Sequence, residues 1–366
     1  MGTTAEQLEQ TDSPNHGLVR RAALAASLGT AIEWFDYASY GYLAVIIASV
    51  FFPPGDQTAA LLSTFAVFAI SFIVRPIGGV VWGHYGDKLG RKLTLMLEVT
   101  IMSLSTFCIG LIPSYAKIGI WAPTLLLICR VVQGFSASGE YAGAASFLAE
   151  FAPSNKRGLL VSLVPASTAF GLMSGALIVA ILEFNLTEAA LYSWGWRIPF
   201  LLALPLGLIV LYMRTKLEDT PVFIEMQEKA KASKQDDESS IEAGSFAGVM
   251  KHKKNVLRAF GIVLLNAVGF YTLLSYMPTY LIEEVGYSKI QGTLITLVTL
   301  ITYTIMLPIV GSIADRVGRK PVLMTACVLF LIFAYPTFHL LSKGLAFSIL
   351  ALILLGAMLA GNDGVL

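Results

Sequence analysis

The sequence contains few charged residues. Only 13% of its 366 residues are Asp, Glu, Lys or Arg, whereas 56% are hydrophobic. A soluble domain carries roughly 25% charged residues, so this chain cannot build an ordinary water-facing surface. The formal net charge is +1, which leaves no basic surface for nucleic acid and excludes nucleic acid as a partner. These absences predict a protein embedded in the lipid bilayer.

Cysteine and histidine are also scarce. The three cysteines lie inside apolar runs and far apart in the sequence, which argues against a disulfide framework or a zinc site. The four histidines fall mostly in tails and loops and form no ligand cluster. We therefore expect no metal site, no cofactor and no enzymatic activity.

Ten apolar stretches are each about long enough to cross a bilayer as a helix. A β-barrel would need alternating strands of about ten residues, and these stretches do not alternate. The sequence thus predicts an all-α, multi-pass membrane protein with spans near residues 22–50, 58–82, 93–112, 122–149, 159–182, 198–213, 256–282, 290–311, 321–341 and 345–366.

Basic residues outside the spans collect on one side of the predicted membrane, as illustrated by Arg21, Lys92, Arg157, Arg214 and Arg319. Loops rich in Lys and Arg face the cytoplasm in multi-pass proteins. We therefore predict that the N-terminus is cytoplasmic.

Two loops carry nearly the same sequence, GHYGDKLGRK from Gly83 to Lys92 and GSIADRVGRK from Gly311 to Lys320. Six predicted spans separate them, which indicates two six-helix halves in a parallel repeat. The predicted organisation is a cytoplasmic tail (1–21), a first bundle (22–215), a cytoplasmic linker (216–254) and a second bundle (255–366). If the halves match, the second lacks its last two helices, so about ten of twelve are present.

The repeated loops place acids and arginines at facing helix ends. We expect their ion pairs to hold the cytoplasmic side closed, while Gly83 and Gly90 allow a close helix approach and a tight turn. The alternative is an ordinary basic loop with incidental acids. The charged residues of this predicted gate are Asp87, Arg91, Asp315 and Arg319.

Five charged residues are predicted inside the spans of the first half and form a candidate proton and charge relay. Such residues are costly in a membrane and mark ion and substrate pathways. From their depth we expect Asp36 near Arg130, and either Glu33 or Glu140 near Arg75. Arg130 and Glu140 are too far apart along their helix to pair. The alternative is a structural role for these carboxylates.

Two further acids, Glu98 and Asp363, also fall within predicted spans. Glu98 is near a cytoplasmic end, where it could extend toward water. For this reason Glu98 is ranked below the relay candidates.

Aromatic and polar side chains near the relay are candidate substrate contacts. Aromatic rings on the first span could hold an ammonium group by cation–π attraction. Membrane packing alone is the alternative for all of them. The candidates are Trp34, Tyr37 and Tyr40 on the first span, Gln133 and Tyr141 near Arg130, and Asn266 and Tyr271 on the seventh span.

The two G-x-x-x-D-[RK]-x-G-R-[RK] loops resemble the signature of the major facilitator superfamily. The segments EWFDY, RPIGG, RVVQGFSASGEYAGA, WGWRIPF and LEDTPVF resemble its metabolite:proton symporter branch. Within that branch, the run from Ile101 to Ser136 is most similar to the bacterial proline/betaine transporters, a group of proton-coupled osmoprotectant permeases.

This resemblance implies a major facilitator fold of two six-helix bundles in a bacterial inner membrane. It implies alternating access and symport of a proton with a zwitterion such as proline or glycine betaine. The proton would sit on Asp36, Glu33 or Glu140, and the solute carboxylate would meet Arg130 or Arg75. Two alternatives remain: proton symport of a dicarboxylate or other organic acid such as 2-oxoglutarate, and a truncated fragment that does not transport.

Overall fold

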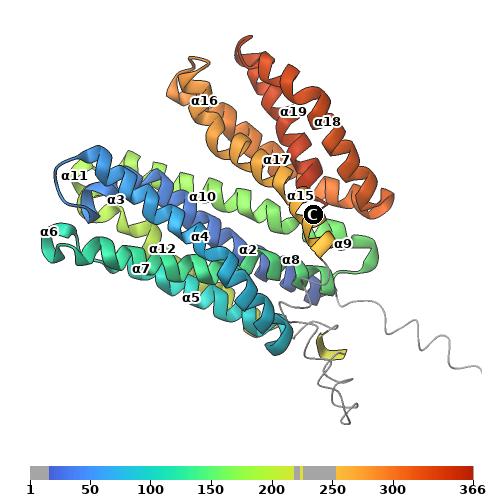
Figure 1. The fold of residues 1–366 in the computed structure, drawn as a ribbon, viewed down its shortest axis with the longest axis horizontal. Helices are drawn as coiled ribbons and strands as arrows, with labels where there is room; N and C mark the ends of the chain where they lie inside the picture. The colour runs from blue at the N-terminus through green and yellow to red at the C-terminus, as the bar shows by residue number, and fades with distance from the viewer. Residues whose placement is uncertain (1–15, 218–222, 226–252, 366) are drawn as a thin grey trace, which may run out of the picture.

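A computed structural model of the protein describes residues 16–217, 223–225 and 253–365 (Figure 1). The regular structure in these residues is helical, and they contain no β-strand. This confirms the predicted all-α class. Most of the predicted N-terminal tail and of the predicted linker lies outside the described residues.

The first half of the chain folds into helices that run back and forth as a bundle. Short helices connect some of the long ones at their ends. The elements are α2 (His16–Tyr42), α3 (Ala44–Phe51), α4 (Gln57–Leu89), α5 (Arg91–Leu111), α6 (Tyr115–Ile118), α7 (Trp121–Ala137), α8 (Glu140–Phe151), η1 (Ser154–Lys156), α9 (Arg157–Val161), α10 (Leu163–Asn185), α11 (Glu188–Ala190), η2 (Leu191–Gly195) and α12 (Arg197–Thr215).

The second half contains fewer long helices among the described residues. It comprises α15 (Lys253–Phe270), the π-helical segment η5 (Tyr271–Tyr276), α16 (Met277–Glu283), α17 (Lys289–Val317), α18 (Arg319–Leu340) and α19 (Leu345–Asp363). Segments of π-helix inside longer helices often occur at functional sites. Here η5 holds Tyr271, one of the predicted substrate contacts.

Eight helices of the described chain are long and apolar enough to cross a membrane, and the bent pair α2–α3 can supply a ninth. The axis turns by 71° between α2 and α3. The predicted fourth span is interrupted at Ser138 and Gly139, where α7 ends and α8 begins. The chain is therefore a multi-pass membrane protein, as its sequence predicts.

Local sequence explains where several helices begin. Asp56 caps α4 by accepting hydrogen bonds from the backbone N–H groups of Thr58 (2.9 Å) and Ala59 (3.1 Å). Ser288 and Gln291 form a capping box at the start of α17. Both devices satisfy N–H groups that the first turn of a helix leaves without partners.

The two repeated loops lie at the same end of the molecule, which we call the basic side. At this end Arg91 of α5 is 3.7 Å from Glu150 of α8, and Asp315 of α17 contacts the start of α9. The two halves approach each other beside α9 and diverge toward α11 and α16 (Figure 1). The fold therefore joins the halves at the basic side and separates them at the other.

Close packing of α4 against α7 explains part of the glycine pattern. A Cβ atom on Gly134 would collide with the backbone of Ser71, and one on Gly78 would collide with Phe135 and Ser138. Gly78 of RPIGG and Gly134 therefore allow α4 and α7 to approach closely, whereas a Cβ on Gly79 would meet no described atom within 4 Å. These close contacts bring Arg75 and Arg130 into the same bundle interior.

Candidate functional site

The centre of the first half holds Asp36 of α2 against Arg130 of α7. Arg130 Nη1 donates to Asp36 Oδ2 at 2.6 Å, and both side chains are buried. Gln133, one turn further along α7, donates to the same oxygen and also to Thr106 Oγ1 at 3.0 Å. The predicted approach of Asp36 to Arg130 is confirmed, and Gln133 belongs to the same group.

Tyr40 packs against this pair. Its ring lies 3.8 Å from Arg130 Cζ, and its hydroxyl donates to the Thr64 carbonyl at 3.0 Å. The face of the Tyr40 ring is therefore covered by the Arg130 guanidinium, although we predicted this ring as a contact for the ammonium group of a ligand. Removing this charged pair from water is costly, and the ring and Gln133 offset part of that cost.

A second ion pair joins Glu33 of α2 to Arg75 of α4. Arg75 Nη2 donates to both Glu33 Oε1 and the Tyr37 hydroxyl. The guanidinium also lies about 5 Å from the rings of Tyr37 and Phe72. Of the two partners that the sequence offered for Arg75, Glu33 is right and Glu140 is wrong.

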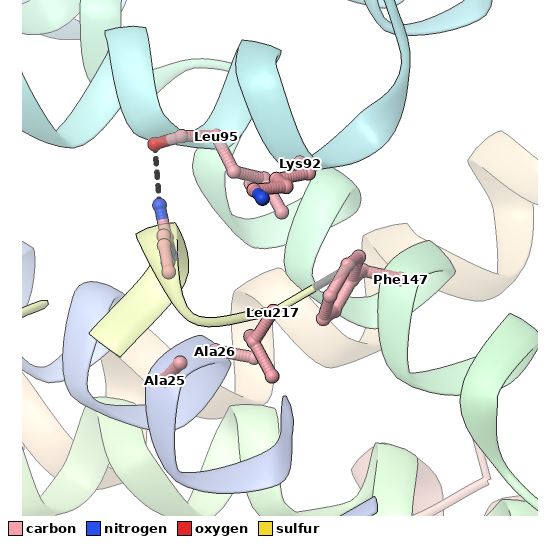
Figure 2. Close-up of a pocket in the computed structure, with 7 residues that line it drawn as sticks. Ala25, Ala26, Lys92, Leu95, Phe147 and Leu217 are labelled. Carbon is pink, nitrogen blue, oxygen red and sulfur yellow. Dashed lines mark hydrogen bonds between the residues drawn. The ribbon is translucent and has the colours of Figure 1, made fainter. Parts of the chain in front are cut away.

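Glu140 instead pairs with Arg214 of α12. Arg214 donates to both carboxylate oxygens of Glu140, from Nη1 to Oε2 at 3.1 Å and from Nη2 to Oε1. It also donates to the Leu95 carbonyl of α5 (Figure 2). Sequence reasoning missed this role because it assigned Arg214 to the cytoplasmic basic residues, but the side chain is only 3% exposed.

A small cavity borders this pair on the basic side. Ala25, Ala26, Lys92, Leu95, Phe147, Arg214 and Leu217 line it (Figure 2). Its volume of about 10 Å³ is at the lower limit for one water molecule. It is therefore too small to be the site of an organic solute.

The predicted contacts of the seventh span lie where the two halves meet. Trp34 of α2 meets Phe270 of α15 edge-on, with ring centroids 5.2 Å apart. Tyr271, which follows Phe270, is 45% exposed and is close enough to Arg75 and Glu33 to interact with their charges. Trp34, Arg75 and Tyr271 therefore face one region between the halves.

Asn266 contributes to a separate polar cluster in the second half. It donates to Asp363 Oδ1, while the Tyr303 hydroxyl donates to Asp363 Oδ2. Tyr303 and Asp363 are buried, and both atoms of the neighbouring Asn362 amide are buried without a hydrogen-bond partner among the described residues. Asp363 was recognised as an acid within a span, whereas Tyr303 carried no sequence signal.

Tyr141 does not join the Arg130 group, although continuous helical phase predicted that it would. The break between α7 and α8 interrupts that phase. Tyr141 packs instead against an apolar cluster that contains Leu95, Phe147 and Leu148, and it is close enough to Asp363 for an electrostatic interaction.

The two repeated loops use their acids differently. In the first, Asp87 Oδ1 lies 2.9 Å from Arg91 Nη2, which confirms the predicted pair. In the second, Asp315 forms no ion pair with Arg319. Its carboxylate instead accepts hydrogen bonds from the backbone N–H groups of Gly158 (2.6 Å) and Leu159 (2.9 Å). The expected pairing of Asp315 with Arg319 is therefore wrong. Asp315 binds the first half at the N-terminus of α9.

The glycines of these loops also differ from expectation. Gly90 has φ +96°, as the predicted tight turn requires, and Gly318 has φ +100° at the equivalent place. A Cβ on Gly83 would meet no described atom within 4 Å, so the close approach expected there is absent. The close approach is at Gly311, where a Cβ would lie 2.5 Å from the Gly158 carbonyl oxygen.

Two helical halves joined at one end, with ion pairs buried inside the first, define a multi-pass membrane transporter. The family model described as "Sugar (and other) transporter" matches residues 22–361. The chain belongs to this family of the major facilitator superfamily, which confirms the resemblance seen in its sequence and assigns it to transporters rather than enzymes.

Named relatives in bacteria are similar along most of the chain. The glycine betaine/proline/ectoine/pipecolic acid transporter OusA of Dickeya dadantii is 43% identical over 357 residues, covering 96% of this chain and 70% of the relative. The proline/betaine transporter of Escherichia coli is 42% identical over 355 residues, with the same coverage. The ectoine/proline transporter ProP of Corynebacterium glutamicum is 40% identical and covers 89% of this chain and 66% of the relative.

Solved structures show the same fold. The proton:xylose symporter XylE bound to 6-bromo-6-deoxy-D-glucose has a TM-score of 0.73 at 18% identity, covering 96% of this chain and 81% of that chain. A partially occluded, inward-open form of XylE from E. coli has a TM-score of 0.65, covering 95% and 83%. The described helices thus follow the major facilitator fold.

Proposed function

We propose that this protein imports a small zwitterion together with a proton by alternating access. The solutes named for its relatives, proline, glycine betaine, ectoine and pipecolic acid, each carry a carboxylate close to a cationic nitrogen centre. The observation that carries the proposal is the buried group of Asp36, Arg130 and Gln133 in a chain this similar to those transporters.

Asp36 is the site that we assign to the coupling proton. Its Oδ2 is held by Arg130 and Gln133, whereas its Oδ1 is buried without a partner among the described residues. Protonation of Asp36 would neutralise it and weaken its attraction to Arg130. Because Asp36 lies on α2 and Arg130 on α7, a proton bound here changes how these two helices hold each other.

Arg75 is better placed than Arg130 to meet the solute carboxylate. Both arginines have guanidinium nitrogens without a partner among the described residues, Nε in Arg75 and Nε and Nη2 in Arg130. The Arg75 side chain is 24% exposed, however, whereas the Arg130 side chain is 0% exposed. The indole N–H of Trp34 is also buried without a described partner. The solute carboxylate would therefore bind near Arg75 and Trp34, with its cationic nitrogen against the rings of Trp34 and Tyr271.

The contact of Asp315 with α9 would keep the basic side closed in this conformation. A carboxylate at a helix N-terminus is favoured by the free N–H groups and by the helix dipole. Positive residues gather at this side, so we place it, with the N-terminus, in the cytoplasm of a bacterium. Solute and proton would then enter from the opposite side, where the halves diverge (Figure 1).

The test is uptake of radiolabelled proline, glycine betaine and 2-oxoglutarate by proteoliposomes that contain the purified protein. Each solute is measured with and without an inward proton gradient. Gradient-dependent accumulation of proline or glycine betaine is the expected result. Accumulation of 2-oxoglutarate alone would favour organic-acid symport, and zwitterion uptake that ignores the gradient would contradict proton coupling.

A further inference from the structure

The buried charges of the first half do not balance. Four acids inside it are at most 2% exposed: Glu33, Asp36, Glu98 and Glu140. Three arginines meet them, and Arg75, Arg130 and Arg214 each form an ion pair with one acid. Among the described residues, Glu98 is the buried acid of this half that has no ion-pair partner.

Glu98 lies on α5 beside Gly139, which precedes α8, and Gly143, which lies within α8. A Cβ on Gly139 would collide with Glu98 Oε1, and one on Gly143 would lie 3.9 Å from Glu98 Oε2. The Oε2 atom is buried with no hydrogen-bond partner in the described part of the chain. The side chain therefore fills a space that these glycines leave open, and it does not extend to water as the sequence suggested.

Charges of both signs act on Glu98 from the surrounding helices. They are Glu140 on α8, Glu33 on α2, Arg214 on α12 and Arg91 on its own helix. Arg214 already donates to both oxygens of Glu140 and to the Leu95 carbonyl. An ionised carboxylate at Glu98 would be buried without a direct counter-ion, which is strongly unfavourable compared with a neutral acid.

The four acids also follow one another toward the basic side. On α2, Glu33 is about 4.5 Å from Asp36 along the axis, and Gly29 is about 6 Å beyond Glu33. A Cβ on Gly29 would collide with Glu140 Oε1. Glu140 in turn follows Gly139, whose absent side chain leaves room for Glu98, and Glu98 is two turns from Arg91 at the basic end of α5.

We propose that Glu98 holds a proton in this conformation and is the last buried station through which the coupled proton leaves toward the basic side. This inference rests on the proposed proton symport. In each transfer an O–H bond of one carboxylic acid breaks and an O–H bond forms on the next carboxylate, directly or through a water molecule. Glu98 first releases its own proton toward the basic side, which leaves a carboxylate. The coupled proton then passes in the order Asp36, Glu33, Glu140 and Glu98, so that Asp36, Glu33 and Glu140 are carboxylates again and Glu98 is protonated once more.

The proton on Glu98 can be tested without transport. The infrared spectrum of the purified protein should contain the C=O stretching band of a protonated carboxyl group, and Glu98→Gln should remove intensity equal to one such group. Glu183→Gln, which changes an exposed acid of α10, should leave the band intact. If Glu98→Gln does not fold, Glu98→Asp should shift the band. An unchanged band in the folded variant overturns the assignment.

The exit role is tested by comparing two transport modes in proteoliposomes with labelled proline or glycine betaine. Glu98→Gln should lower proton-driven accumulation by about 10-fold or more, as expected when a proton-transfer group is removed. Exchange of labelled for unlabelled solute needs no net proton release and should stay within about twofold of wild type. Equal loss of both modes, or loss of neither, contradicts the exit role.

The outcomes separate this inference from the proposed function. If the wild-type protein shows no gradient-driven uptake of either zwitterion, the proposed function fails. The infrared measurement then still decides whether Glu98 is protonated. If the wild type accumulates solute and Glu98→Gln accumulates it equally well, the exit station fails while the proposed symport stands.

Discussion

Trp34 and Phe270 touch edge-on, with ring centroids 5.2 Å apart, and so join the middle of the first half to the second half. Phe270 immediately precedes η5, and Trp34 immediately follows Glu33 in the sequence. A solute near Arg75 would therefore sit beside the aromatic contact that must change when the halves move. The same residues can report on both solute binding and conformational change.

Replacing Trp34 by Ala should weaken solute binding, because it removes an aromatic ring of the proposed site and an indole N–H group that has no partner among the described residues. A cation–π contact contributes about 0.5–2 kcal/mol, so we expect KM for proline or glycine betaine to rise by about 2- to 30-fold. Initial uptake rates over a range of solute concentrations provide the measurement. Trp194→Ala, at an exposed tryptophan of η2, is the matched control and should leave KM unchanged.

Asp36→Asn should uncouple solute movement from the proton. The amide can still accept a hydrogen bond from Arg130, but it carries no titratable proton, so gradient-driven accumulation should fall by about 100-fold. Solute exchange should persist at a measurable rate. Asp56→Asn is the control, because Asn caps a helix about as well as Asp. Accumulation that persists in Asp36→Asn would remove this residue from the coupling mechanism.

Gly29→Ala should destabilise the protein, because the new Cβ would collide with the ion pair of Glu140 and Arg214. Overpacking a buried site typically costs about 1–3 kcal/mol. The apparent melting temperature in detergent should therefore fall. Gly41→Ala on the same helix is the matched control, since a Cβ there would meet no described atom within 4 Å. Similar melting temperatures for the two variants would contradict the packing observed at Gly29.

Asp315→Ala should open the basic side, because it removes the acceptor for the N–H groups of Gly158 and Leu159. Ser162→Cys provides the probe: Ser162 is 1% exposed and lies beside Gly311 at this contact. In a background with the three native cysteines replaced, thiol labelling of Cys at this position should become about 10-fold faster in Asp315→Ala. Glu188→Ala, at the opposite end of the molecule, should not change the labelling rate.

The sequence was most informative where charge is costly. A charged side chain inside a span needs a partner or a cavity, so depth along the helices was enough to predict that Asp36 approaches Arg130. Depth also limited the partners of Arg75 to two acids, Glu33 and Glu140. It could not choose between them, because that choice depends on how α2, α4 and α8 are rotated about their axes.

The sequence was least informative where backbone groups or helix ends take part. Asp315 bonds to backbone N–H groups of α9, and no residue type marks such a partner. Arg214 lies near the end of a span, where basic residues normally face water, yet α12 continues to Thr215 and keeps its guanidinium inside the bundle. The position of Tyr141 was predicted wrongly because the helix is interrupted at Ser138 and Gly139, and no proline in the sequence indicates this interruption.

The three arginine–carboxylate pairs of the first half have an electrical consequence. Each pair is neutral as a unit, so moving the bundle relative to the bilayer carries almost no net charge. In the proposed symport the zwitterion is also neutral, so the proton is the only charge that crosses in a transport cycle. Each 100 mV of membrane potential, negative inside, would therefore add about 2.3 kcal/mol of driving force per proton. The membrane voltage alone should drive accumulation even when the pH is equal on both sides.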